Sequence, residues 1–485
     1  MSRKKGKKTI FGEAYEKFAI ATPVAVMVRD VIEHALSPAI VDRLFEEARQ
    51  TQYTRELLFS SVVKVFSEVV LGVHPAVHSA YTQHAEEIEV SEKAFYDKLA
   101  GTDPSVCSAL VSHSGREFRA VLDQMGGGLE SPLPGWEVRI LDGNWPEATE
   151  RRLKVLRQVE DRPMPGKAMV VLNPSQMLIE HAWPGENGKA SERALIAPVL
   201  PWIGPGQVWI ADRNFCFWAF ILAVLAAQAF FVLRQHGQFQ PQALEEFRVV
   251  GRNAHGVVSE QRVQGRLPHG QLTEWRRIRV QLDQPTRDGE TVVYVLTNLP
   301  VEVADALQVA ALYLGRWTIE HVFQDIEASL QSEINTLAYP RAVLLALCLG
   351  FVAYNVLALV KGAMRVVHGA QKVEREVSVY YMAGELGNTS RGLAIAVPES
   401  TWAKVRGLHP DELAQEMLRL AGLMNLRHYQ KHRRGPKKKP PERRQLGRGN
   451  NVSTARLIGE ASPRRAIRNR ALAIEATTAR LLASE

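Results

Sequence analysis

The chain has 485 residues, of which 46% are hydrophobic and 23% are charged, as is typical of a folded soluble protein with about two to four domains. Its 3 cysteines lie far apart without a CxxC pair, which argues against a disulfide framework and against a zinc site. A reducing, intracellular compartment fits this cysteine usage. No apolar stretch directly follows the basic N-terminus, so the sequence does not predict a secretory signal.

Positive charge is concentrated at the two ends of the chain. Residues 1–8 carry five Lys and Arg, residues 427–448 carry ten against one Glu, and residues 449–485 carry a net three. The two ends therefore carry a net charge of +17, while the whole chain carries +8. The body, residues 9–426, accordingly has a net charge of −9. Basic ends on an acidic body indicate a polyanionic partner such as nucleic acid. A solvated tail that only aids solubility would have the same composition.

The first part of the chain, residues 1–130, predicts helices. Apolar residues recur at helical spacing in 54–71, and Ser91 is a typical N-cap for the segment that follows it. A further helix is predicted at 104–125, before a triple glycine at 126–128 that is typical of a linker. Short helices of this kind could form a DNA-binding module or a plain helical bundle, and the sequence does not decide between the two.

From Trp136 onward, short runs rich in apolar and β-branched residues predict strands that alternate with helices. The order is three strands, a helix, a strand, a helix and a strand. This order predicts a mixed α/β sheet of the RNase H-like kind, in which the first and fourth strands are neighbours. The predicted strands are 136–141, 167–173, 176–183, 207–211 and 230–234, and the predicted helices are around 189–199 and at 217–228.

Residues 236–300 interrupt this pattern with alternating, β-branched segments and predict a small β insertion. Trp275 in this insertion could stack on a flipped base, or simply pack on its own sheet, which we favour. Helices resume at Val303 and are predicted to run to about residue 368. Within them, 342–360 is almost as long and apolar as a membrane span, but Asn355 interrupts it, so a buried core helix explains it better than a span.

Two acidic residues follow predicted strands. Asp142 comes just after 136–141 and Asp212 just after 207–211. If these strands are neighbours, the two carboxylates lie at the edge of the sheet where ligands bind in open α/β sheets. The alternatives are that Asp142-Gly143 forms a turn and that Asp212 caps a helix.

A third acid lies on a predicted helix between residues 311 and 327. Its polar residues are spaced by three and four and are therefore expected on one face: Tyr313, Arg316, Glu320, Gln324 and Glu327. A solvated surface would show the same spacing. However, a phenol, a guanidinium and a carboxylate in one line form a suitable set for holding a phosphate beside a metal ion. Hard oxygen ligands such as carboxylates suit Mg²⁺ or Mn²⁺.

This segment resembles the signature of bacterial insertion-sequence DDE transposases, RNase H-like enzymes of the cut-and-paste type. The signature has Tyr, Arg, Glu and Lys with two, three and six residues between them, and Tyr313, Arg316 and Glu320 match it. Leu141-Asp142-Gly143 resembles the family's first Asp motif, and Ile210–Phe215 its second. One departure is Glu327, which stands where the family has lysine, and this removes one expected contact with DNA phosphate.

The resemblance implies a DNA transposase in which Asp142, Asp212 and Glu320 bind two Mg²⁺ or Mn²⁺ ions. Such an enzyme cuts the ends of its element and joins the free 3′-OH to target DNA. The N-terminal helices would read terminal inverted repeats, and a homodimer on DNA is expected, with no membrane partner and a cytoplasmic, nucleoid-associated location in a bacterium. Residues expected to contact DNA are Tyr313, Arg316, Lys437, Lys438, Lys439, Arg443 and Arg444.

Two other functions remain open from the sequence alone. One is an RNase H-like nuclease that cuts DNA without strand transfer, and the other is a non-catalytic DNA-binding relative. The expected organisation is a helical DNA-binding domain, a catalytic core in two parts separated by the β insertion, and a helical and basic C-terminal region. In chain order, these parts are 1–130, 131–235, 236–300, 301–395 and 396–485.

Overall fold

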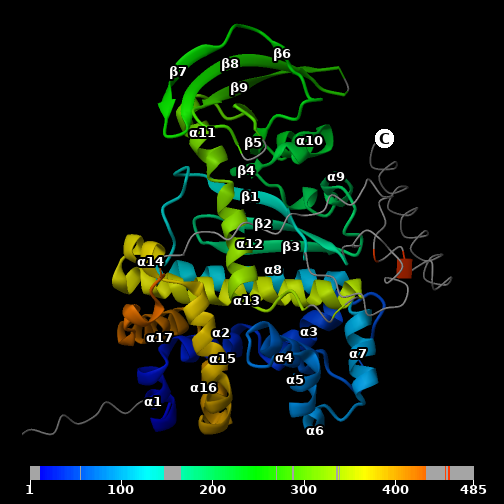
Figure 1. The fold of residues 1–485 in the computed structure, drawn as a ribbon, viewed down its shortest axis with the longest axis vertical. Coiled ribbons are helices and arrows are strands. Elements are labelled where there is room, and N and C mark those ends of the chain that lie inside the picture. The colour runs from blue at the N-terminus through cyan, green and yellow to red at the C-terminus, as the bar shows by residue number, and fades with distance from the viewer. Residues whose placement is uncertain are drawn as a thin grey trace, which may run out of the picture.

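A computed structural model describes most of the chain between residues 11 and 432. The described residues are 11–54, 56–146, 165–268, 270–286, 289–334, 337, 339–432, 454 and 457–458. Figure 1 shows a β lobe at one end, a central sheet below it, two long helices across the sheet, and a group of shorter helices at the other end. The basic residues predicted at 1–8 and at 437–444 lie outside the described residues.

The N-terminal part is helical, as predicted. The Oγ of Ser91 accepts a hydrogen bond from the amide of Ala94 at 3.3 Å, so Ser91 is the predicted N-cap. The longest helix of this part ends at Gly126, whose φ of 66° is the left-handed C-cap conformation that glycine adopts without a steric cost. The helices are α1 (Glu13–Ala21), α2 (Pro23–Ala35), α3 (Pro38–Ala48), α4 (Phe59–Val70), α5 (Val77–Gln83), α6 (Ala85–Ile88), α7 (Glu92–Gly101) and α8 (Pro104–Met125).

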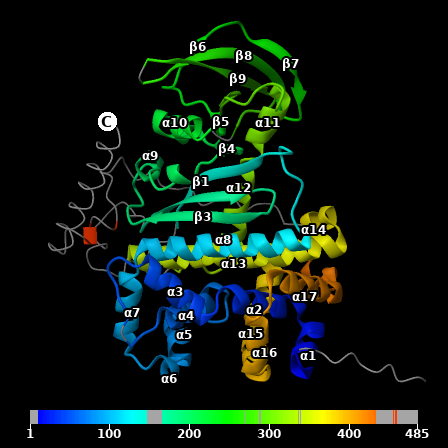
Figure 2. The ribbon, with the colours of Figure 1, turned by 180° about the vertical axis from the view of Figure 1, so that it is seen from behind.

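One of the three glycines after α8 is closely packed, although the sequence suggested a linker there. A Cβ on Gly127 would lie 2.9 Å from the backbone carbon of Gly362, so these two glycines let α8 and the long helix α13 (Pro340–His368) approach closely. The two helices lie side by side in both views, across one face of the sheet (Figures 1 and 2). The N-terminal helices and this face of the sheet therefore share one hydrophobic core.

The predicted mixed α/β sheet is confirmed. Its first five strands lie in the order β3-β2-β1-β4-β5, where β1 is parallel to β4, β4 is parallel to β5, and β2 is antiparallel to both neighbours. The first and fourth strands are therefore neighbours, as the sequence predicted. The strands are β1 (Glu137–Asn144), β2 (Lys167–Asn173), β3 (Leu178–Gly185), β4 (Gln207–Ala211) and β5 (Phe230–Arg234).

One helix between these strands is shorter than predicted. The segment expected to be helical at 189–199 forms only α9 (Glu192–Leu195), followed by the short 3₁₀ turn η2 (Leu200–Trp202). Pro198 and Pro201 explain the difference, because each lacks the amide that a continuing helix needs. After β4 come the 3₁₀ turn η3 (Arg213–Phe215) and α10 (Trp218–Ala226).

The predicted β insertion consists of strands, but it is not a separate sheet. Its last strand pairs antiparallel with β5 through Thr297 and Val232, so the insertion extends the central sheet. The sheet therefore contains ten strands. The added strands are β6 (Gln242–Ala243), β7 (Arg248–Asn253), β8 (Gly256–Arg266), β9 (Leu272–Leu282) and β10 (Val292–Thr297).

The helices that follow the insertion run from the β lobe down to α13 (Figure 1). The helix predicted between 311 and 327 is in fact two helices, because i→i+4 hydrogen bonding continues to the amide of Gly315, which bonds to the carbonyl of Ala311 at 2.9 Å, and is interrupted after it. The amides of Arg316 and Ile319 instead bond three residues back. These helices are α11 (Ala306–Leu314) and α12 (Trp317–Ser329). After α13 come α14 (Ala370–Glu376), α15 (Val379–Ala396), α16 (Glu399–Arg406), α17 (Pro410–Leu423) and η4 (Leu426–Tyr429).

Helix α13 meets the length and composition criteria for a membrane span, and its most apolar 18-residue window is 100% buried within the protein. Asn355, the residue that interrupts its apolar run, is fully buried and bonded. Its Oδ1 accepts from the amide of Ile179 at 2.8 Å, and its Nδ2 donates to the carbonyl of Ile179 at 2.8 Å. Nδ2 also donates to Ser114 Oγ of α8 at 3.1 Å. One polar side chain thus ties the core helix to strand β3 and to α8.

Candidate active site

Asp142 lies within β1 rather than beyond its end, which corrects the sequence prediction. Parallel pairing of β1 with β4 stops at Leu141 and Ala211, but β1 continues to pair with β2, where Asp142 is opposite Val170. Pairing with β2 extends the strand beyond the point where β4 ends. The proposed turn at Asp142-Gly143 is therefore not present, although the amide of Gly143 does donate to Asp142 Oδ1 at 2.8 Å.

Asp212 directly follows β4, as predicted. It occupies the N-cap position of η3, but its side chain makes no capping hydrogen bond. The alternative of a simple helix cap is therefore not supported. Its Oδ1 instead lies 3.4 Å from the hydroxyl of Tyr313, at the end of α11.

The break between α11 and α12 places Arg316 between two acids. Its Nη1 lies 2.7 Å from Oδ2 of Asp142, and its Nη2 lies 2.7 Å from Oε1 of Glu320. The Arg316 side chain is 7% exposed, while the side chains of Asp142 and Glu320 are 17% and 30% exposed, so the guanidinium is the most shielded of the three groups. Together with the Tyr313–Asp212 contact, this double ion pair brings all five residues predicted from the acidic and signature motifs to one edge of the sheet.

Burial and neighbouring charges shift the pKa values of three residues at this site. Burial raises the pKa of Asp142 to about 7; Arg316 and the Gly143 amide oppose this shift, while Glu192 and Glu320 add to it. Burial and the charge of Asp212 raise the pKa of Tyr313 to about 12. Burial alone would lower the pKa of Arg316, yet its acidic neighbours, Asp142 foremost, raise it. The acidic neighbours therefore stabilise the charged form of Arg316 at this site.

Arg316 supplies the positive charge next to Asp142 and Glu320. Within the described part of the chain, no three His, Cys, Asp or Glu side chains are grouped closely enough to hold a metal ion. The donor chemistry nevertheless suits a hard divalent cation, since Asp142, Asp212 and Glu320 offer only carboxylate oxygens. Metal binding at these residues requires Asp142 and Glu320 to exchange the Arg316 guanidinium for the ion.

A fourth acid, Glu192 at the start of α9, was missed by the sequence analysis. Its Oε1 lies 3.1 Å from Lys167 Nζ, and both side chains are about 10% exposed. A Cβ on Gly143 would meet the same oxygen at 2.8 Å, so a glycine beside Asp142 leaves room for this carboxylate. The only local signal was Ser191, which caps α9. Nothing in that signal places Glu192 beside Asp142.

A second charged group borders Asp212. Arg234, at the end of β5, and Arg213 both contact the carboxylate of Glu290, the latter with 3.1 Å between Arg213 Nη1 and Glu290 Oε1. Glu290 foremost, with Tyr313 and Asp212, raises the pKa of Arg234 against the effect of burial. The edge of the sheet at Asp212 is therefore lined by arginines as well as acids.

The remaining predicted DNA contacts divide into three cases. The tail residues Lys437, Lys438, Lys439, Arg443 and Arg444 lie outside the described residues. Trp275 is 2% exposed and packs against Phe231 and Trp218, so it lies within its own sheet, as we favoured, and is not available to a flipped base. Glu327 is exposed on α12.

Exposure at Glu327 leads to a prediction. Replacing Glu327 with Lys adds two units of positive charge to the exposed side of α12, and we expect a few-fold tighter DNA binding and faster cleavage. Binding of a labelled DNA duplex and the rate of strand cleavage would both be measured. Glu333→Lys, four residues after the end of α12, is the control for a general charge effect. Slower cleavage by Glu327→Lys would show that the family comparison misleads at this position.

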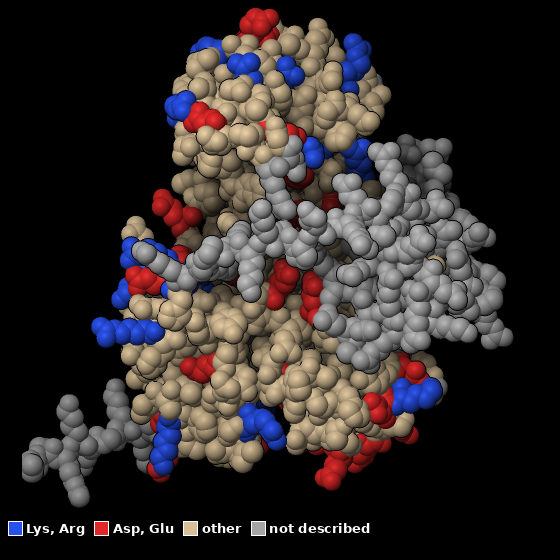
Figure 3. Space-filling view, viewed as in Figure 1, with Lys and Arg blue, Asp and Glu red and all other residues tan. Residues whose placement is uncertain are grey.

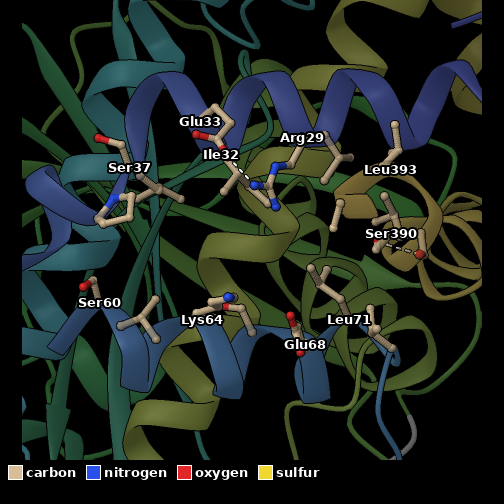
Figure 4. A pocket seen from close by; sticks show the side chains of 18 of the residues that line it. Arg29, Ile32, Glu33, Ser37, Ser60, Lys64, Glu68, Leu71, Ser390 and Leu393 are labelled. Carbon is tan, nitrogen blue, oxygen red and sulfur yellow. Dashed lines mark hydrogen bonds and ion pairs between the residues drawn. The ribbon is translucent and has the colours of Figure 1, made fainter. Parts of the chain in front are cut away.

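A cavity of about 840 Å³ lies far from these residues, between α2, α4 and α15 and above the apolar surface of α13 (Figure 4). Arg29 and Glu33 of α2 form an ion pair at its wall, and Lys64 and Glu68 of α4 face them across it (Figure 4). None of the five residues at the sheet edge lines this cavity. It is thus separate from the candidate active site.

One family model matches part of the chain. Residues 164–356 match the transposase DDE domain. The matched segment contains Asp212, Tyr313, Arg316 and Glu320, while Asp142 precedes it. This match supports a DDE transposase.

Two further comparisons complete this result. No curated protein matches the chain. Among solved structures, the chain is similar to the piggyBac transposase in a cryo-EM structure of its synaptic complex with hairpin DNA. The identity is 8%, the TM-score is 0.33, and the similarity covers 77% of this chain and 81% of the piggyBac chain.

Proposed function

We propose that this protein is a DNA transposase of the insertion-sequence group with the Tyr-Arg-Glu-Lys signature. In this proposal it cuts DNA at the ends of its element and joins the released 3′-OH to target DNA. The observation that carries the proposal is the double ion pair of Arg316 with Asp142 and Glu320, because it joins a strand and a helix that are far apart in sequence. The strand order of β1 to β5 and the DDE domain match add support for an RNase H-like core.

Asp142, Asp212 and Glu320 are the residues that would hold divalent metal ions. When bound, two such ions activate the attacking oxygen and stabilise the leaving oxygen of a phosphodiester. In the first step water forms a bond to phosphorus, and the bond from phosphorus to the 3′ oxygen breaks, releasing a 3′-OH. In the second step that 3′ oxygen forms a bond to a phosphorus of the target strand, and the bond from this phosphorus to the target's own 3′ oxygen breaks, releasing a target 3′-OH.

Arg316 and Tyr313 are placed to hold the phosphate during these steps. Arg316 presents a planar, permanently charged fork that matches two phosphate oxygens. If Asp142 and Glu320 held cations in place of Arg316, the guanidinium would be free to bind the DNA backbone. Tyr313 keeps its proton at neutral pH, because burial and Asp212 raise its pKa to about 12, so it serves as a hydrogen-bond donor.

The proposal extends to partners and location. The basic N- and C-terminal residues would add affinity for DNA that depends on salt but not on sequence. Cutting and joining two element ends calls for two copies of the chain, so we propose a homodimer on DNA. A bacterial cytoplasm, at the nucleoid, is the compartment in which this substrate is found.

The decisive experiment uses DNA that carries the short inverted repeats flanking the gene. We expect cleavage at these repeats, and joining to a target plasmid, in Mg²⁺ or Mn²⁺. With EDTA in place of the metal, we expect binding without cleavage. Cleavage without any joined product would favour a nuclease, and binding without cleavage in either metal would favour a non-catalytic DNA-binding protein. Cleavage that persists in EDTA would contradict the proposed metal chemistry.

A further inference from the structure

An arginine pair on the β lobe stands apart from the candidate active site. Side chains alternate between the two faces along β9, so Arg277 and Arg279 lie on one face with Trp275, and Ile278 and Val280 lie on the other. Ile278 and Val280 belong to the core that also contains Tyr313, whereas Trp275 packs against α10. The arginine pair is therefore on the opposite face of the sheet from the helix that carries Tyr313.

Both guanidinium groups are held in place by aromatic rings. Arg279 lies 4.4 Å from the ring centre of Phe247, and Arg277 lies 5.2 Å from the same ring and 5.8 Å from that of Tyr294. Phe247 and Tyr294 are themselves in contact, with ring centres 6.0 Å apart. Such cation–π contacts fix the planes of the guanidinium groups without neutralising their charge.

Buried polar groups on the neighbouring strand β8 add to this arrangement. Gln261 and Ser259 lie directly opposite Arg277 and Arg279 in the antiparallel pair of β8 and β9. Arg277 Nε donates to Oε1 of Gln261 at 2.9 Å, and Arg279 Nη2 donates to Oγ of Ser259 at 3.2 Å. Gln261 is 3% exposed and Ser259 is 1% exposed, so buried neutral acceptors orient both arginines from the side.

The charge of the pair is not balanced by carboxylates. Other arginines of the lobe form ion pairs, Arg252 with Asp283, Arg262 with Glu274 and Arg276 with Glu260. Within the part of the chain that the structure describes, neither Arg277 nor Arg279 has an ion-pair partner. Consistent with this, burial lowers the pKa of Arg277, and the interaction with Tyr294 opposes this shift only in part. Removing two cations partly from water without pairing them to acids destabilises the fold. Binding of an anionic ligand to Arg277 and Arg279 would offset this desolvation cost.

The pair is close enough to the candidate active site to serve the same substrate. Strand β9 is next to β10, which is next to β5, and adjacent strands are about 4.8 Å apart. The carbonyl of Tyr294, directly opposite Arg279, accepts from the amide that follows Arg234. Figure 3 shows Lys and Arg side chains on the lobe above a hollow that contains Asp and Glu atoms.

We infer that Arg277 and Arg279, oriented by Phe247, form a second DNA contact that binds backbone phosphates next to the cut. Bidentate guanidinium–phosphate bonds account for the planar, ring-supported geometry. Tyr294, whose side chain is 37% exposed, is placed beside them to contact a sugar or an unstacked base. This inference rests on the proposed function, which it deepens by assigning a phosphate-binding site outside the signature residues.

The test measures binding of the full chain to a fluorescent DNA duplex of arbitrary sequence, in EDTA and over a range of salt concentrations. Each phosphate contact contributes about 0.9 to the slope of log affinity against log salt. We expect the double variant Arg277→Gln, Arg279→Gln to lose about ten-fold in affinity and to flatten the slope by about 1 to 2. Arg262→Gln, which breaks an exposed ion pair on the same lobe, is the matched control and should leave the slope unchanged.

Two further variants separate phosphate binding from a structural role. Arg277→Lys with Arg279→Lys keeps the charge and should restore most of the slope, whereas Phe247→Leu keeps the slope but weakens binding. An unchanged slope in the double Gln variant, with wild-type DNA binding and an unchanged melting temperature, would overturn the inference and leave the proposed function intact. A wild-type protein that does not bind the duplex even at low salt would contradict the proposed function itself.

Discussion

Replacing Asp142 with Asn is expected to abolish metal-dependent cleavage while leaving DNA binding within about two-fold of the wild type. Asn keeps the size of the side chain and can still accept the hydrogen bond from the Gly143 amide. It removes the anionic oxygen that a divalent ion requires. A bound metal contributes several kcal/mol to transition-state stabilisation, so we expect a loss of about a thousand-fold or more in rate. Single-turnover cleavage of an end-containing duplex measures this effect.

The control for this variant is Asp283→Asn. Asp283 is another acid of the same sheet, in an ion pair with Arg252, and its loss should not slow cleavage. Loss of DNA binding in a folded Asp142→Asn protein would count against a purely catalytic role for Asp142. Cleavage at the wild-type rate would remove Asp142 from the site altogether, and with it the two-metal proposal.

Of the substitutions proposed for this protein, Asn355→Leu is expected to cause the largest loss in the free energy of unfolding. Leu has a similar volume, but it leaves the buried amide and carbonyl of Ile179 without partners. Each unsatisfied buried polar group costs about 1–3 kcal/mol, so we expect a loss of about 4 kcal/mol in the free energy of unfolding. Urea unfolding followed by circular dichroism measures this free energy.

Asn388→Leu is the matched control for helical Asn, because Asn388 lies exposed on α15 and should change stability by less than about 0.5 kcal/mol. If Asn355→Leu does not give soluble protein, Ser114→Ala removes only one of the partners of Asn355 and should give a smaller, measurable loss. Equal stabilities of Asn355→Leu and the wild type would show that these hydrogen bonds do not hold α13 to β3.

Tertiary context also explains how the candidate active site combines opposite charges. Arg316 neutralises Asp142 and Glu320 in the absence of a metal, and burial keeps the pKa of Asp142 near 7. The raised pKa means that Asp142 binds a proton in the folded protein at mildly acidic pH. At the proposed metal site, an ion would have to displace this proton as well as Arg316, because both occupy the same carboxylate.

Local sequence patterns were sufficient to predict most of the elements and to propose candidate site residues. Apolar periodicity and capping residues predicted α8 and its boundaries, and the β-branched runs predicted the core strands. These signals depend on neighbours within a few residues, so they can be recognised in the sequence without knowledge of the fold. The acids Asp142, Asp212 and Glu320 could be selected for the same reason, because each stands at a fixed position in a local motif.

Only the tertiary structure decided which of these groups meet. The contact of Arg316 with two acids depends on the break at Gly315, and the place of Glu192 beside Asp142 depends on how α9 packs at the sheet edge. Strand pairing joins the β insertion to the central sheet. In this arrangement Trp275 is buried, whereas Arg277 and Arg279 on the same strand remain partly exposed. Such contacts join residues that are far apart in the chain and depend on strand register and on packing. Neither strand register nor packing can be read from the residues near a given position in a single sequence.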